Sequence, residues 1–322
     1  ILPEPLAREP LPVLGCYVVG SAIVSVWALG ALGLQVFRPV RLDRDSLRAM
    51  WRFSLPLIAT TWVSLLGTYW IDYIVITKFL SLAHLGLYSL ANQVAGVVQQ
   101  VTIISSSILL PHFSVLVAKG DTGAIQRFIS GVLPWGFLAL SLFLGLFMLH
   151  VGPVVPALFG REFDASVQPL ALLMIATILL ALYNSFTPLL TAQGATWTLM
   201  WITLPTAAVN IVMDLLLVPL LGINGAALST VLAYATSAGL VLFVVGRRVG
   251  QPLLSYAWFG LPVVLVVLCT FLLTGWTLYV CGLLLLAGSA LFLARLFGLR
   301  RNDEVMILLV GLLGDRFRRV PG

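Results

Sequence analysis

Two acidic residues lie inside long apolar stretches of the chain, where a charged side chain is costly. Asp72 precedes Lys78 by six residues, and Asp214 precedes Gly222 by eight. A carboxylate at the centre of a bilayer costs roughly 2.5–3.5 kcal/mol on insertion scales, so such a residue normally faces a partner, a cavity or water. We interpret both residues as candidates for ion coupling or gating. The alternative is a protonated or hydrogen-bonded contact between helices.

Polar residues also form a stripe along the apolar segment 84–117. On a helix with 100° per residue, its members fall within about 100° of one another. The stripe predicts either the wall of a wet cavity or polar contacts between helices, which contribute about 0.6–2 kcal/mol each in lipid. Asn184 is a further candidate for the cavity wall. The members of the stripe are Ser89, Asn92, Gln93, Gly96, Gln100 and Ser107, with Gln99 and Ser106 at its edge.

The motifs of soluble enzymes are absent from the sequence. It contains no P-loop, GxGxxG, HExxH or GxSxG pattern. The three histidines are far apart, and the three cysteines stand in apolar runs without a CxxC pair. We therefore expect no metal, no cofactor and no catalytic residue, and we predict that the protein is not an enzyme.

Composition places the chain in a membrane. Apolar residues make up 60% of the 322 positions and charged residues only 9%, whereas a soluble domain carries about 25% charged residues. About 20 apolar residues cross a bilayer as a helix, which satisfies its own backbone hydrogen bonds. We predict an all-α, polytopic transmembrane bundle of about nine helices. The predicted spans are 11–37, 53–77, 84–117, 128–159, 166–192, 197–219, 223–246, 253–275 and 276–298.

The basic residues indicate the orientation. When the spans alternate in direction, all of the 18 Lys and Arg residues except Arg8, Lys78 and Arg161 fall on one side. Cytoplasmic loops carry the excess of basic residues, so the C-terminus is expected in the cytoplasm. The net charge of +6 then reflects this bias and an attraction to membrane lipids, and no nucleic acid is needed to explain it. Segments 38–52 and 299–322 mix basic and apolar residues, which is typical of amphipathic elements at a membrane surface.

Six short motifs follow one another over residues 50–246. They are Trp70–Ile76, Leu85–Ala91, Leu109–Ser114, Leu158–Phe163, Leu189–Gly194 and Val209–Ala227. This series resembles the polysaccharide-biosynthesis flippases of the multidrug/oligosaccharidyl-lipid/polysaccharide exporter (MOP) superfamily, which include flippases of O-antigen and related lipid-linked oligosaccharides.

The resemblance implies two six-helix lobes around a central cavity, with twelve to fourteen helices in all. On that plan the chain is a C-terminal portion, and the first five helices are absent from it. Its parts would be an outer stub with the last helix of the first lobe (1–37), a cytoplasmic linker (38–52), the second lobe (53–246), an additional helix pair (247–298) and a cytoplasmic tail (299–322).

The resemblance also implies an activity. It is the translocation of an isoprenoid-pyrophosphate-linked oligosaccharide to the outer leaflet of a bacterial or archaeal cytoplasmic membrane, by alternating access, for synthesis of surface polysaccharide. The implied partners are the lipid-linked substrate, membrane lipids, and polysaccharide polymerase and ligation machinery. No Arg or Lys lies deep in spans of 53–246, so cations for the pyrophosphate would come from the other lobe.

Three other functions fit the sequence less well. A cation-coupled multidrug antiporter of the same superfamily would use the membrane carboxylates, and a lipid II or sporulation-type flippase would share the fold. A membrane-embedded glycosyltransferase or polymerase would need a larger polar loop than the outer segment 160–166.

Overall fold

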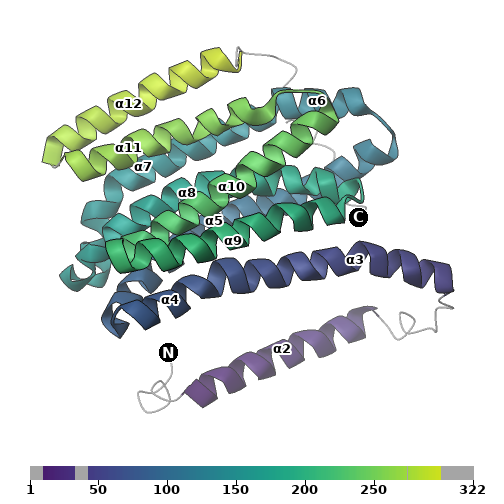
Figure 1. Ribbon diagram of the computed structural model, residues 1–322, viewed down its shortest axis with the longest axis horizontal. Helices are drawn as coiled ribbons and strands as arrows, with labels where there is room; N and C mark the ends of the chain where they lie inside the picture. Colours follow the sequence, from purple (N-terminus) through teal and green to yellow (C-terminus); the bar gives the residue numbers. More distant parts are fainter. Residues whose placement is uncertain (1–9, 33–42, 274, 299–322) are drawn as a thin grey trace. The chain divides into compact units, whose positions relative to one another are not determined.

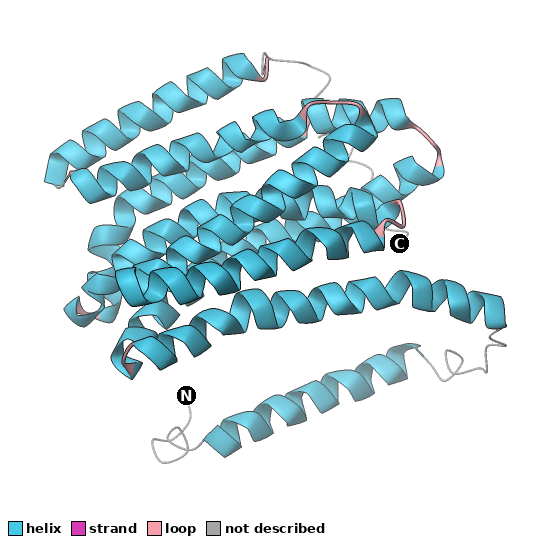
Figure 2. Cartoon of the chain, viewed as in Figure 1, coloured by secondary structure: helices cyan, strands magenta, loops and turns pink. Residues whose placement is uncertain are grey.

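The computed structural model describes residues 10–32, 43–273 and 275–298, and every regular element in these ranges is a helix (Figures 1 and 2). The prediction of an all-α bundle is therefore confirmed. The chain divides into two compact units, Ile1–Trp51 and Arg52–Gly322. The outer stub before residue 10 and the predicted amphipathic tail 299–322 lie outside the described residues.

Seven helical segments in the described ranges are long and apolar enough to cross a membrane. They match the predicted spans from 84–117 to 276–298. These segments are Leu82–Ala118, Thr122–Phe159, Arg161–Ala192, Thr196–Leu221, Ile223–Val249, Leu253–Leu272 and Gly275–Leu296.

The two remaining predicted spans are helical where the structure describes them. Span 11–37 corresponds to α2 (Pro10–Leu32). Span 53–77 consists of three consecutive pieces, namely α3 (Arg44–Ser64), a π-helical turn η2 (Leu65–Trp70) and α4 (Ile71–Phe79). A π turn inserts an extra residue into the helix and rotates the side chains that follow it.

The segment 38–52, expected to be an amphipathic element at the membrane surface, is described from residue 43 onward. From Arg44 onward it forms the first turns of α3, which continues into the apolar residues. No glycine or proline stands between Arg44 and Leu55 to end the helix. Asp43 precedes the helix, and its carboxylate accepts a hydrogen bond of 2.6 Å from the Ser46 backbone N–H, as an N-cap does.

The other helices run along the bundle in Figure 1. Within the predicted span 128–159, α6 ends at Gly131, and Pro134 stands in the first turn of α7. The elements are α5 (Leu82–Ala118), α6 (Thr122–Gly131), α7 (Leu133–Phe159), the 3₁₀ turn η3 (Arg161–Ser166), α8 (Val167–Ala192), α9 (Thr196–Leu221), α10 (Ile223–Val249), the 3₁₀ turn η4 (Leu253–Gly260), α11 (Leu261–Leu272) and α12 (Gly275–Leu296).

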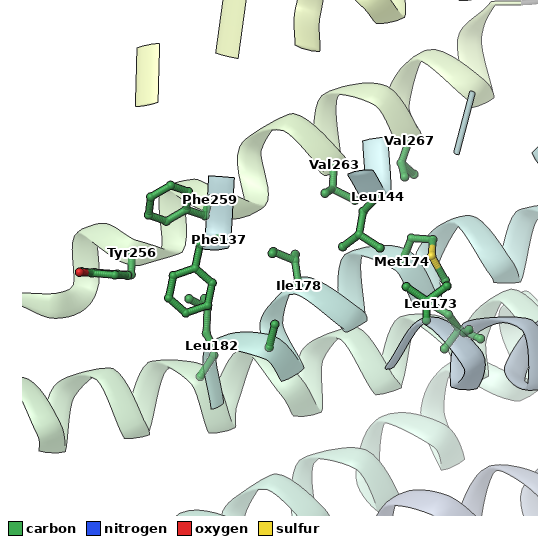
Figure 3. Packing of buried hydrophobic residues seen from close by; sticks show 14 of the residues in the cluster. Phe137, Leu144, Leu173, Met174, Ile178, Leu182, Tyr256, Phe259, Val263 and Val267 are labelled. Carbon is green, nitrogen blue, oxygen red and sulfur yellow. The ribbon is translucent and has the colours of Figure 1, made fainter. Parts of the chain in front are cut away.

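Helix α8 lies at the centre of the core and contacts α5, α7, α10 and α11. Figure 3 shows the apolar packing around it, where Phe137 and Leu144 of α7 and Val263 of α11 meet Met174 and Ile178 of α8. All five side chains are buried. Because lipid is as apolar as these residues, close van der Waals packing is what holds such helices together.

Two glycines bring α9 close to its neighbours. A Cβ atom on Gly225 of α10 would lie 2.3 Å from the Leu217 backbone oxygen of α9, and one on Gly67 of η2 would lie 2.7 Å from Ala207 Cβ of α9. Side chains at either position would push the helices apart. These contacts fix α9 between η2 and α10, which is where the polar residues converge.

Candidate functional site

Four helices bring polar side chains to one depth near the same end of the bundle. Asp72 lies seven residues before the end of α4, and Asp214 lies seven before the end of α9. Tyr88 and Ser229 lie six residues after the starts of α5 and α10. At 1.5 Å per residue, each is roughly 10 Å from its helix end. Because α4–α5 and α9–α10 are tightly connected pairs, the four side chains fall at the same level.

Asp72 is only 4% exposed and accepts hydrogen bonds from three different helices. The Tyr88 hydroxyl of α5 donates to its Oδ2 atom. The Asn210 amide of α9 donates to Oδ1 at 2.9 Å, and the Thr230 hydroxyl of α10 donates to Oδ2 at 3.2 Å. Asp72 therefore ties α4 to α5, α9 and α10.

Asp214 is fully buried beside Asp72. The Ser229 hydroxyl donates to its Oδ1 atom, and Asn210 Nδ2 approaches its Oδ2 atom at 3.4 Å. The Asn210 amide thus bridges the two carboxyl groups. We call these six residues the carboxylate cluster: Asp72, Tyr88, Asn210, Asp214, Ser229 and Thr230.

The cluster has no cationic member. Every partner that the described residues offer to the two carboxyl groups is neutral. The carboxyl groups also lie close enough to interact with each other. Two negative charges cannot persist side by side in a low-dielectric interior without a proton or a cation between them.

The oxygen atoms of the cluster suit a proton or a hard cation. Asn210 is fully buried, and its Oδ1 atom accepts no hydrogen bond from any residue that the structure describes. Carboxyl oxygens are ligands that hard cations prefer, whereas the Asn210 amide faces both carboxyl groups with its nitrogen. Within the described ranges, no group of three or more His, Cys, Asp or Glu side chains gathers to hold a metal.

The polar residues of the stripe on α5 differ in their burial and in their hydrogen-bond partners. Gln99 is buried and donates to the Thr177 hydroxyl of α8 at 3.4 Å, whereas Gln100 is exposed. Asn92 donates to the Tyr73 hydroxyl at 2.9 Å. Gln93, also exposed, donates to Ser89 at 3.0 Å on the same helix.

The other two predicted cavity residues lie together. Ser107 and Asn184 line one cavity of about 270 Å³ between α5 and α8. The Asn184 amide donates to the Thr102 hydroxyl at 2.9 Å. Asn184 also lines a second cavity nearer the carboxylate cluster. The structure therefore brings Asp72 to Asp214 and Ser107 to Asn184, but it does not join Ser89, Gln93 or Gln100 to either pair.

The sequence analysis did not single out Asn210, Thr206 or Thr203. These residues and Asp214 follow one another at intervals of three, four and four residues, which places them on one face of α9. All four are buried. This spacing could have shown from the sequence that the four polar residues share a helix face, but the apolar residues between them obscured the pattern.

The geometry can now be compared with known proteins. Residues 16–168 match the model of a family described as polysaccharide biosynthesis protein. The chain is 24% identical over 225 residues to a probable low-salt glycan biosynthesis flippase, Agl15, of Haloferax volcanii, an alignment that covers 69% of this chain and 46% of the relative. The predicted resemblance is confirmed. The chain is similar to polysaccharide-biosynthesis proteins and to a glycan flippase.

A second curated relative is named for multidrug resistance. The chain is 26% identical over 187 residues to a probable multidrug resistance protein, NorM, of Thermotoga maritima, with 52% of this chain and 39% of the relative covered. The chain thus spans less than half the length of either curated relative.

Two solved structures resemble the fold at low identity. One is a MOP superfamily transporter from Pyrococcus furiosus, with 18% identity, a TM-score of 0.49 and coverage of 70% of this chain and 53% of that one. The other is an outward-facing multidrug resistance transporter of the MATE family, with 18% identity, a TM-score of 0.47 and the same coverage.

Proposed function

We propose that the protein containing this chain is a flippase for lipid-linked oligosaccharides. It moves an isoprenoid-pyrophosphate-linked glycan from the cytoplasmic to the outer leaflet of the cytoplasmic membrane, for synthesis of cell-surface polysaccharide. The match of residues 16–168 to a polysaccharide-biosynthesis family carries this proposal, and the glycan flippase relative supports it. The glycan would then pass to polymerase and ligation machinery on the outer side, and the C-terminus would face the cytoplasm.

The carboxylate cluster would make this transport respond to a proton or a cation. Its two acidic side chains are buried at membrane depth beside neutral partners. When the cluster is neutralised by a proton or cation, the hydrogen bonds from α5, α9 and α10 can all converge on Asp72. When it is not, repulsion between Asp72 and Asp214 favours a different arrangement of α4 and α9. Occupancy of the cluster would therefore bias two conformations of the lobe.

The cluster cannot bind the pyrophosphate itself. Ionised carboxylates accept hydrogen bonds and repel an anion, whereas phosphate groups require cations or N–H donors. The pyrophosphate would be bound elsewhere in the complete protein. In this chain we assign the cavity-lining role to Ser89, Asn92, Gln93, Gln100, Ser107 and Asn184 as a proposal that thiol labelling can test.

One observation favours a second candidate function. A buried pair of acidic residues also suits a cation-coupled multidrug antiporter, and NorM is among the relatives. The two functions predict different phenotypes, so one strain can distinguish them.

The experiment is a deletion of the full-length gene in its own host. We expect lipid-linked oligosaccharide to accumulate while surface polysaccharide is lost, and the wild-type gene should restore both. Unchanged lipids together with increased sensitivity to cationic drugs would overturn the flippase assignment in favour of the antiporter.

A further inference from the structure

A second polar cavity adjoins the carboxylate cluster. It measures about 550 Å³, within the range of small-molecule sites. Helices α3, α5, α8, α9 and α10 and the π turn η2 all contribute to its wall. Its rim includes exposed side chains of Thr61 and Leu65, and its floor includes buried Thr68, Thr203 and Thr206. We call this cavity the hydroxyl pocket.

The side chains that line the hydroxyl pocket are uncharged, and their apolar atoms make up most of its surface. Ten of its thirteen side chains carry a hydroxyl or amide group, and none of the thirteen carries a charge. Tyr183 and Tyr234 add two aromatic rings to the wall.

The hydrogen bonds of the wall leave acceptors facing the pocket. Thr203 donates to the Leu199 carbonyl at 3.0 Å and Thr206 to the Ile202 carbonyl at 2.9 Å, each one turn back in α9. Thr60 and Thr61 of α3 do the same at 2.7 and 2.9 Å. Because a hydroxyl has one hydrogen and two lone pairs, each of these oxygens can still accept a hydrogen bond, and the Tyr183 hydroxyl lies 3.5 Å from the Thr203 oxygen.

This arrangement selects the ligand by its hydrogen-bonding groups. Asn184 likewise commits its amide nitrogen to Thr102, so its carbonyl oxygen is its acceptor. A pyrophosphate is acceptor-only and strongly anionic, and no cationic side chain lines this pocket to bind it. A sugar is neutral, carries many O–H donors and has apolar C–H faces that suit aromatic rings. The pocket therefore matches the saccharide part of a lipid-linked glycan and not its phosphate part.

The hydroxyl pocket also lies one helical turn from the carboxylate cluster on three elements at once. Thr68 precedes Asp72 by four residues, Thr206 precedes Asn210 by four, and Tyr234 follows Thr230 by four. Residues four apart share a helix face. A ligand in the pocket would thus contact the residues that neighbour the cluster on η2, α9 and α10.

We propose that the hydroxyl pocket binds an uncharged sugar residue of the transported glycan. This inference rests on the proposed flippase function. It adds the location of the saccharide within this lobe. On this proposal the sugar and the pyrophosphate are recognised at different places. The uncharged wall of this pocket binds the sugar and offers no cation for the pyrophosphate.

The first test removes acceptors without changing side-chain size. The double variant Thr203→Val/Thr206→Val, made in the full-length gene, should lower flipping roughly tenfold, since each lost hydrogen bond contributes about 0.5–1.5 kcal/mol. The matched control is Thr236→Val on α10, which loses a similar bond to the Leu232 carbonyl outside the pocket. Lipid-linked oligosaccharide in the membrane, surface polysaccharide and protein abundance are measured together.

The second test identifies the occupant directly. A p-benzoylphenylalanine photocrosslinker replaces Leu65 on the rim, and the control places it at Trp62, which is 58% exposed on α3 but does not line the pocket. Cells are fed radiolabelled sugar precursors and irradiated. We expect a labelled adduct of saccharide mass at position 65 and not at position 62.

The outcomes separate this inference from the proposed function. If deletion of the gene accumulates lipid-linked oligosaccharide but the double variant flips normally, only the pocket assignment fails. An adduct at position 65 that contains acyl lipid or a cationic drug but no sugar also overturns it. If deletion leaves lipids unchanged, the flippase function itself fails. Should the double variant reduce protein abundance, the crosslinking result alone decides.

Discussion

Asp72 and Asp214 occupy different positions in one hydrogen-bond network. Among the described residues, Asp72 receives donors from α5, α9 and α10, whereas the donors to Asp214 come from its own helix and α10. Loss of the charge on Asp72 would therefore affect more helix contacts than loss of the charge on Asp214. At this scale the sequence located both carboxyl groups, because an acidic residue in an apolar run stands out.

The first prediction concerns Asp72→Asn. The substitution keeps the side-chain size but removes the group that binds a proton or cation, so transport should fall at least roughly tenfold. Abundance should hold, because a neutral amide costs less in a membrane than a carboxylate. The control is Asp164→Asn on the exposed turn η3. Equal transport by wild type and Asp72→Asn across the pH range would disprove a coupling role.

A second prediction concerns Tyr88→Phe, which removes one donor to Asp72 and keeps the ring. Tyr88 is fully buried, and a neutral hydrogen bond contributes about 0.5–1.5 kcal/mol. Transport should fall severalfold, less than in Asp72→Asn, and its pH profile should shift. Tyr279→Phe on α12 is the matched control. If Tyr88→Phe leaves the rate and the pH profile of transport unchanged, the hydroxyl does not act on the cluster.

At the scale of the elements, α9 is positioned by close contacts with its neighbours. A third prediction compares two substitutions on α10. Gly225→Ala places a Cβ atom 2.3 Å from the Leu217 oxygen, so it should destabilise the bundle by about 1–3 kcal/mol. Gly239→Ala meets no atom within 4 Å and should be neutral or stabilising, since alanine favours helix. Thermal unfolding in detergent measures both, and an equal midpoint for the two variants would refute the contact.

A fourth prediction concerns the polar stripe of α5, in which some residues are exposed and others are buried. A cysteine at Gln100 should react with a water-soluble maleimide if that face lines a wet cavity, whereas a cysteine at Gln99 should be protected by α8. Labelling of intact membranes measures both. Protection at Gln100 as well as Gln99 would leave the stripe with a packing role alone.

The sequence predicted helices better than it predicted their meeting points. Hydropathy located the spans because about 20 apolar residues are needed for each crossing. The joining of 44–52 to α3 was missed because amphipathic composition does not show where a helix starts. The carboxylate cluster was missed as a unit because Asn210 and Asp72 are 138 residues apart, and only the folded chain brings them together.

The polar wall of the hydroxyl pocket shows the same limit. Its threonines and serines are common residues in membrane helices, where they bond to their own backbone. Of the residues predicted to line a cavity, Asn184 alone is part of this wall. No local pattern reveals that α3, α8, α9 and α10 all contribute such side chains to one space. The pocket became visible only from the packing of α3, α5, α8, α9 and α10.

At the scale of the molecule, the cluster and the hydroxyl pocket lie within one compact unit, Arg52–Gly322. The chain covers less than half of its curated relatives, so transport is a property to be measured on the full-length protein. A proton or cation at the cluster and a sugar in the pocket would be bound one helical turn apart. That proximity gives a physical route by which ion occupancy could change the affinity for the glycan.

Transport of a lipid-linked glycan is tested most directly in proteoliposomes that contain the full-length protein. Fluorescent lipid-linked oligosaccharide is placed in one leaflet, and its arrival in the other is followed with an impermeant quencher, with and without a proton gradient. We expect transfer that depends on the protein, that the gradient alters, and that Asp72→Asn reduces. Transfer no faster than in protein-free vesicles, together with gradient-driven export of a cationic dye, would contradict the account.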